Sequence, residues 1–210
     1  MRVGGHGPWS FEVAEGERVA VVAGSSYARL ALVSILAGCL PPASGRLRLL
    51  GEDPNALPRA KALALFRQVG IVREGGGLVS NLRAWENVLL PASYHEGLVA
   101  DEVLPRVQGY FERLGLAGDA LASCLDSLPG LLPEHWRRIV GLVRALVMEP
   151  RLMLYEVILD GLPASLARAV AELVASFHDG RPGRTSVFVV THAASVSQLA
   201  AARTIELRGD

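Results

Sequence analysis

The sequence predicts an α/β fold, and three observations support this expectation. Short apolar runs typical of strands alternate along the chain with apolar-periodic stretches typical of helices. The run RLMLYEVIL, residues 151–159, is almost continuously apolar, as expected of a parallel strand buried on both faces. Residues 81–148 are mostly helical in pattern. We therefore expect one domain over residues 1–210, with a helical subdomain inserted at about residues 80–140.

The individual elements follow from local patterns. Residues 9–13 and 18–22 read as strands around a Glu-Gly-Glu turn, and residues 44–54 as a strand that ends in a turn. The remaining expected strands are residues 69–74, 151–159, 185–192 and 203–207. The expected helices, besides those in residues 81–148, are residues 28–38, 57–68, 163–178 and 193–202. Breaks in the helical region are expected at Pro91, Gly97, Gly115 and Pro129-Gly130.

Composition excludes several classes of protein. Half of the 210 residues are hydrophobic, which is globular rather than disordered, and the formal net charge is zero. A neutral chain is a poor candidate for nucleic-acid binding, which depends on neutralising phosphates. Two cysteines form no disulfide framework and suit a cytosolic location. No apolar run approaches the roughly 20 residues of a membrane helix, so work at a membrane would need another chain.

Residues 19–38 have the layout of a phosphate-binding loop. An apolar strand at residues 19–22 leads into a small-residue turn, Gly24-Ser25-Ser26, and then into an apolar-periodic helix. The amide groups at such a helix N-terminus attract anions. The lysine and the hydroxyl residue that complete a phosphate-binding loop are nevertheless missing.

The order of the motifs resembles the nucleotide-binding domain of ABC transporters. The stretches that carry this resemblance span nearly the whole chain: SFEVAEGERVAVVAGSS, ILAGCLPPASGRLRLLGEDP, NLRAWENVLLP, RALVMEPRLML and VFVVTHAASVSQLAAARTIEL. The resemblance implies a P-loop NTPase-like core with a mixed β-sheet and a helical subdomain. Within the family, VREGGGLVSNLRAWENVLLP looks most like the ATPase subunits of MCE-type (Mla-type) lipid transporters.

The resemblance places Ala23 and Ala28 at the two loop glycines, Arg29 at the lysine and Leu30 at the Mg²⁺-binding hydroxyl. Arginine keeps the charge, but its fork is longer and bulkier than an ammonium group. Two interpretations stay open for the loop around Gly24, Ser25, Ser26 and Arg29. It is either a turn that binds nothing or a weakened anion site.

The acidic end of the strand at residues 151–159 has also changed. Glu156 takes the place of the family's Mg²⁺-holding aspartate, and it is either a vestigial metal residue or a solvated strand end. Val157 replaces the catalytic glutamate, and valine accepts no proton. Pro163 replaces an aspartate that couples the two sites of a dimer.

Among the remaining motif positions of the family, this sequence keeps the family's residue at one. The signature LSGGQ aligns with Leu132 and the four residues Pro133, Glu134, His135 and Trp136, which bring bulk and a negative charge. Glu74 stands at the glutamine of the Q-loop. His192 matches the family's switch histidine, and we expect an inherited structural role rather than a catalytic one.

The resemblance, with these replacements, implies a degenerate ABC subunit. We expect a subunit that docks an integral membrane permease, pairs with an active ATPase subunit or a second copy of itself, and lies peripherally on the cytoplasmic face of the cell membrane. Lipid transport is the narrower expectation. No metal or cofactor is expected, with MgATP at most a weak ligand. The alternatives are a weakly active ATPase or nucleotide sensor using Arg29, Glu156 and His192, and a soluble regulator no longer linked to transport.

Overall fold

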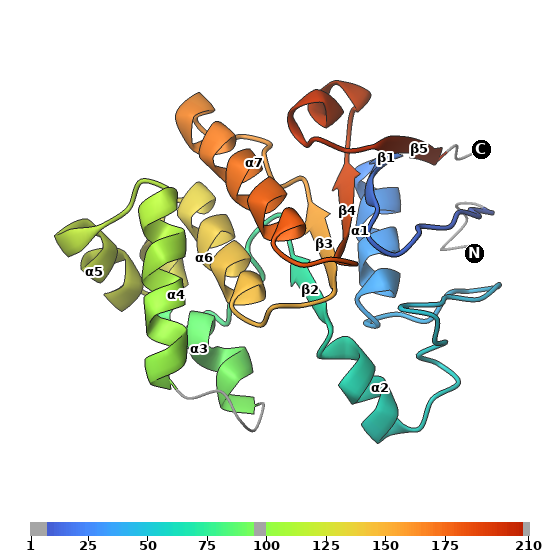
Figure 1. Cartoon of the computed structure of the whole chain (residues 1–210), viewed down its shortest axis with the longest axis horizontal. Coiled ribbons are helices and arrows are strands. Elements are labelled where there is room, and N and C mark those ends of the chain that lie inside the picture. The colour runs from blue at the N-terminus through green and yellow to red at the C-terminus, as the bar shows by residue number, and fades with distance from the viewer. Residues whose placement is uncertain (1–7, 95–99, 208–210) are drawn as a thin grey trace. The chain divides into compact units, whose positions relative to one another are not determined.

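The computed structural model describes residues 8–94 and 100–207 (Figure 1). The described chain forms two compact units. The first holds residues 8–71, 150–157 and 178–207, and the second holds residues 72–94, 100–149 and 158–177. The helical insertion expected at about residues 80–140 falls within the second unit. Gly97, an expected helix break, lies outside the described residues.

Strands and helices alternate as expected of an α/β protein. In chain order the elements are β1 (Arg18–Ala23), α1 (Ser26–Leu36), α2 (Arg59–Phe66), β2 (Val69–Val72), α3 (Ala84–Tyr94), α4 (Ala100–Arg113), α5 (Gly118–Asp126), η1 (Pro129–Leu131), α6 (Glu134–Leu146), β3 (Leu152–Glu156), α7 (Ala164–Asp179), β4 (Thr185–Val190), η2 (Ala193–Gln198) and β5 (Arg203–Leu207). Here η marks a 3-10 helix.

Within the described residues, the five strands form one sheet in the order β2-β3-β4-β1-β5. The pairings of β1 with β4, β1 with β5, and β3 with β4 are all parallel. β3 and β4 are buried at every position, which explains why they read as continuous apolar runs rather than alternating ones. Tyr155 and Phe188 stack on neighbouring strands with ring centroids 4.9 Å apart.

Two expected strands are wrong. Residues 9–13 and 44–54 form no named strand, although Ser44 stands at an isolated β-bridge and Leu49 and Glu52 form an antiparallel one. Residues 47–49 keep the alternation that suggested a strand, because Leu47 and Leu49 are buried in the core and the residue between them is exposed. Alternation reports burial on one side, but a strand also needs a partner to complete its ladder of hydrogen bonds.

Two expectations about helices also need correction. Pro91 does not break a helix, because α3 continues through it to Tyr94. α3 packs against α4, α5 and α6, so tertiary contacts compensate for the hydrogen bond that proline removes. The helix expected at residues 193–202 is the shorter 3-10 helix η2.

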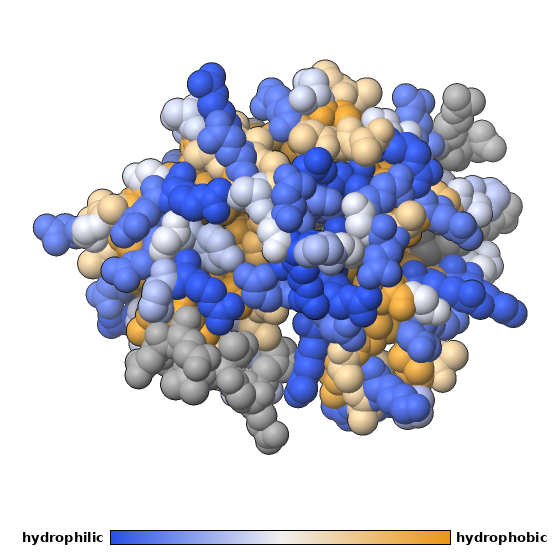
Figure 2. Space-filling view, viewed as in Figure 1, coloured by the Kyte–Doolittle hydropathy of each residue, from blue (hydrophilic) through white to orange (hydrophobic). Residues whose placement is uncertain are grey.

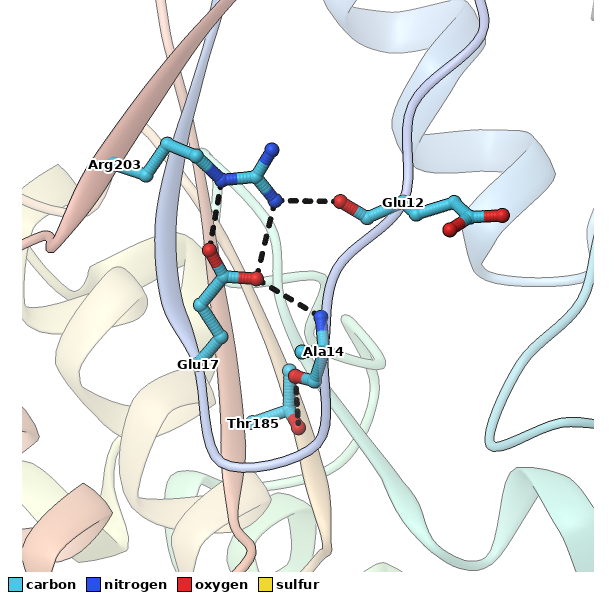
Figure 3. Close-up of polar contacts among 5 residues, drawn as sticks. All are labelled: Glu12, Ala14, Glu17, Thr185 and Arg203. Carbon is cyan, nitrogen blue, oxygen red and sulfur yellow. Dashed lines mark hydrogen bonds and ion pairs between the residues drawn. The ribbon is translucent and has the colours of Figure 1, made fainter.

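A polar network fixes the amino ends of the strands (Figure 3). Arg203, at the start of β5, donates from Nε to Glu17 Oε1 at 2.7 Å and from Nη2 to the Glu12 carbonyl at 2.6 Å. Glu17 also accepts the amide of Ala14 at 2.9 Å, and Thr185 Oγ1, at the start of β4, donates to the Ala14 carbonyl at 3.4 Å. This end of the sheet is thus closed by structural contacts within residues 12–17. The candidate ligand site lies at the opposite edge of the sheet, where the strands have their carboxyl ends.

α2 presents apolar side chains to the surface. Only Leu65 of its eight residues is buried, and Leu63 is 57% exposed. Orange, apolar atoms accordingly reach the surface over α2 at the lower right of Figure 2.

Candidate functional site

The carboxyl edge of the sheet brings together three chain segments of the first unit. β1 ends at Ala23 and leads into α1, β3 ends at Glu156, and β4 ends one residue before Thr191. β4 lies between β1 and β3, so the segments that follow these strands are neighbours. The crevice outside the carboxyl ends of parallel strands is where α/β proteins bind ligands.

The turn before α1 is built as a helix cap. Ser25 is the N-cap residue, and its Oγ accepts the amide of Ala28 at 3.1 Å. The Ser25 carbonyl accepts the amide of Arg29 at 3.0 Å. Gly24, Ser25 and Ser26 are all exposed. The small residues that suggested a phosphate loop therefore begin a helix, with one amide at its positive end already used.

Arg29 does not point into solvent. Its side chain is 8% exposed, and its Nε lies 3.4 Å from Oε1 of Glu156, whose side chain is 3% exposed. The Nη1 group of Arg29 donates to Thr191 Oγ1 at 2.9 Å. One guanidinium therefore connects α1, the end of β3 and the segment after β4. We call Arg29, Glu156 and Thr191 the clasp.

The clasp satisfies both of its charges internally. A buried carboxylate needs a nearby cation, and at Glu156 this cation is the Arg29 guanidinium. An anionic ligand at the α1 N-terminus would have to compete with Glu156 for Arg29. The interpretation of Glu156 as a solvated strand end is wrong, because the residue is 3% exposed.

Val157 follows Glu156 at the position expected for a catalytic glutamate. Its side chain is 1% exposed, and its backbone has a φ of 41°, which is unusual for a β-branched residue. Its amide donates to the Val189 carbonyl at 2.9 Å. Val157 thus fills the core at the end of the sheet and offers no group that could activate water.

His192 directly follows Thr191 of the clasp in the sequence, but its side chain is not part of the clasp. It is exposed, it occupies the N-cap position of η2, and its side chain makes no capping hydrogen bond there. Its carbonyl accepts the Ser195 amide at 3.1 Å. Thr191 rather than His192 contacts Arg29, and sequence reasoning missed it because threonine before the histidine has no distinctive spacing signal.

The signature positions belong to the second unit, at the start of α6. Pro133 is the N-cap residue and makes no side-chain cap bond, and Glu134 is the acidic residue of the first turn. A carboxylate there complements the helix dipole, so this helix end already carries its own negative charge. His135 and Trp136 lie with ring centroids 5.7 Å apart, and both are half-buried.

Glu74, at the Q-loop position, also belongs to the second unit. Its side chain is exposed, while its carbonyl accepts a hydrogen bond from Arg138 Nε at 2.7 Å. The structure therefore brings Arg29 and Glu156 together within one unit. It places Glu74 and residues 133–136 in the other unit.

The sequence of the chain matches the family described as ABC transporter over residues 7–156, which is most of its length. The chain belongs to this family and is an ABC transporter ATP-binding domain.

Relatives at about one-third identity support the assignment. The chain is 33% identical over 199 residues to the macrolide export ATP-binding/permease protein MacB 1 of Aeromonas hydrophila, covering 93% of this chain and 29% of that protein. It is 32% identical over 192 residues to the lipoprotein-releasing system ATP-binding protein LolD 2 of Rhodospirillum rubrum, covering 90% of this chain and 79% of that protein.

Solved structures confirm the fold. The dimeric structure of the ATP-binding cassette MJ0796, in a post-hydrolysis state bound to ADP and Pi, superimposes with a TM-score of 0.81 at 22% identity. The match covers 95% of this chain and 87% of that one. The predicted α/β ABC ATPase core is therefore confirmed. The narrower resemblance to MCE-type ATPases stays a prediction, since these relatives carry other names.

None of the described helices is both long and apolar enough to cross a bilayer. Within residues 8–94 and 100–207, no three histidine, cysteine or acidic side chains lie close enough together to bind a metal ion.

Proposed function

We propose that this domain is a non-catalytic subunit of an ABC membrane transporter, which docks a permease and pairs with an active ATPase subunit or with itself. The observation that carries the proposal is the clasp. Arg29 and Glu156 stand where the resemblance places the phosphate-binding lysine and the Mg²⁺-holding acid, and they are paired with each other at 3.4 Å.

The neighbouring residues do not fit a magnesium nucleotide either. Leu30, at the position of the Mg²⁺-binding hydroxyl, is a 50% exposed apolar side chain. Val157 is buried and cannot serve as a base. Losing one electrostatic or acid-base group typically lowers a rate by about 10²–10³, and here several are missing together. The residues present at this site therefore do not fit ATP hydrolysis.

Permease docking is supported by the surface around the start of α3. Val79 is 39% and Trp85 44% exposed, and both lie in the stretch that resembles the family's permease-contacting region. Such a subunit would sit peripherally on the cytoplasmic face of the membrane, held there by the permease. The relatives' names include both macrolide export and lipoprotein release, so the proposal concerns the role of the subunit and not its cargo.

Site-directed crosslinking in native membranes tests the docking. A cysteine replaces Asn81, which is exposed, in a chain where the exposed Cys39 has been changed to serine. Gly77 is a poor alternative, because its φ of 58° strains any other residue. We expect a crosslink to a membrane-embedded protein from Asn81→Cys and none from Lys61→Cys on α2. Recovery of the native protein in the soluble fraction without a partner would contradict the proposal.

Pairing with an active subunit is tested at the signature positions. Head-to-tail pairing would place residues 132–136 against the partner's nucleotide, where Pro133 and Glu134 impair hydrolysis. Changing Leu132-Pro133-Glu134-His135-Trp136 to Leu-Ser-Gly-Gly-Gln should then raise the ATPase rate of the reconstituted complex. An unchanged rate in a complex that already hydrolyses ATP rapidly would mean that this surface meets no nucleotide.

A weak nucleotide sensor is the second candidate, favoured by the exposed turn Gly24-Ser26 before α1. Micromolar binding of MgATP by the isolated protein would support it over the first proposal.

A further inference from the structure

The loop of residues 74–83 has little regular structure, yet α6 holds its first part closely. Arg138 of α6 is 5% exposed and donates from Nε to the Glu74 carbonyl at 2.7 Å. Arg144, six residues further along α6, donates to the Gly77 carbonyl at 2.9 Å and to the Gly76 carbonyl at 3.0 Å. Three carbonyls of the loop backbone therefore accept hydrogen bonds from charged donors of one helix.

Two glycines allow this close approach. A Cβ at Gly141, inside α6, would lie 2.4 Å from the Gly76 carbonyl oxygen. A Cβ at Gly76 would lie 2.2 Å from the Arg137 carbonyl oxygen, and Gly76 has a φ of 78°. Glycine inside a helix normally weakens it. Here it permits direct backbone contact between loop and helix.

Asn87 of α3 holds the second part of the loop. It is fully buried, its Oδ1 accepts the Val79 amide at 2.7 Å, and its Nδ2 donates to the carbonyls of Val79, Leu82 and Arg83 at 2.9–3.1 Å. Further amide bonds run from Leu82 to Val79 and from Ala84 to Ser127. Both parts of the loop are thus hydrogen-bonded to a neighbouring helix, the first part to α6 and the second part to α3.

We infer that Arg138, Arg144 and Asn87 are positioning residues that keep loop 74–83 in a fixed shape before any partner binds. The inference builds on the proposed docking function, since this loop leads to the exposed Val79 and Trp85. A permease helix would then meet a preformed surface and would not lose free energy by ordering the loop.

Hydrogen exchange of the free protein tests the inference directly. The amides of Gly76, Val79, Leu82 and Ala84 donate hydrogen bonds, so they should exchange more slowly than an unstructured peptide. Arg144→Met should speed the exchange of the Gly76 amide by about tenfold or more, because the charged hydrogen bonds that hold the backbone at Gly76 and Gly77 are lost. Exchange in β3 and β4 should not change. Arg137→Met is the matched control on the same helix, and Arg144→Lys should restore part of the protection.

Two results would overturn the inference. One is exchange of the wild-type loop at the rate of an unstructured peptide, which needs no variant and so does not depend on whether a variant folds. The other is an Arg144→Met protein whose loop exchange equals that of Arg137→Met. Failure of the Asn81→Cys crosslink would instead count against the docking proposal and leave the fixed loop standing.

Discussion

The two charges of the clasp are carried by the buried side chains of Arg29 and Glu156. Removing one partner of a buried ion pair leaves a charge without a counterion, which costs about 3–5 kcal/mol, whereas replacing both partners by apolar groups is often neutral. We expect Arg29→Met or Glu156→Met alone to lower the free energy of unfolding by about this amount. The double variant should return to within about 1 kcal/mol of the parent. Urea unfolding gives the free energy of unfolding of the parent, the two single variants and the double variant. If the losses of the single variants add up in the double variant, Arg29 and Glu156 are not coupled.

Restoring one catalytic residue should not restore catalysis. In Val157→Glu a carboxylate enters a position that is 1% exposed, and Arg29 is already paired with Glu156. We expect lower stability from the buried charge and no ATP turnover above that of the parent. A steady-state phosphate-release assay makes the comparison. Measurable turnover in this variant would mean that the other replaced positions matter little.

His178 should make the stability of the fold depend on pH. It is 8% exposed at the end of α7, and its Nδ1 lies 2.9 Å from Ser186 Oγ. Burial, together with the nearby Arg18 and Arg184, lowers the pKa of His178 below its usual 6.5, although Asp179 and a backbone bond to Gly16 oppose this. The unfolded chain therefore binds a proton more readily than the folded one. Stability should be complete above pH 6.5 and fall as the pH drops below it.

Urea midpoints measured between pH 8 and pH 5.5 test this expectation. The parent should lose more stability over this interval than His178→Gln. Glu17 does not affect this comparison. The hydrogen bond from Arg203 lowers the pKa of Glu17 below 4.5, so protonation of Glu17 changes the stability only in stronger acid. Equal losses in the two proteins would show that His178 does not carry the effect.

At the scale of elements, two glycines should respond to alanine in opposite directions. Gly109 in α4 has no atom within 4 Å of an added Cβ, so Gly109→Ala should stabilise the protein by about 0.5–1 kcal/mol through helix propensity. Gly141→Ala in α6 gains the same propensity but drives its Cβ into the Gly76 carbonyl, so it should destabilise the protein. Thermal unfolding separates the two, and a stabilised Gly141→Ala would show that the loop does not lie against α6.

Most elements could be predicted from the sequence because burial requires a recognisable local pattern of apolar residues. The strands at residues 69–74, 151–159, 185–192 and 203–207 were expected close to where β2, β3, β4 and β5 lie. The expected strands at residues 9–13 and 44–54 failed because strand formation depends on a partner, which local alternation does not report.

The site was less predictable than the fold. Arg29 and Glu156 were recognised as replacements, but their contact joins residues 127 positions apart and depends on the strand order β3-β4-β1. The roles of Thr191 and Arg138 likewise arise only from contacts between residues far apart in the sequence. A motif comparison shows which residue has changed but not what its replacement contacts.

At the scale of the whole molecule, an ATP-binding-cassette fold here carries a site whose charges neutralise each other. The loss of the lysine, the Mg²⁺-binding hydroxyl and the catalytic glutamate, together with the clasp, leads to one expectation for the intact protein. The protein should keep its fold without nucleotide, and adding nucleotide should not increase its stability.

Titration calorimetry of the purified chain with MgATP tests this claim most directly. We predict a Kd weaker than ~1 mM, equivalent to less than roughly 4 kcal/mol of binding free energy, because Arg29 is engaged by Glu156 and Thr191. Glu156→Gln, which weakens the hold on Arg29, provides a comparison in which any residual anion affinity should increase. Micromolar binding of MgATP by the parent protein would contradict the account.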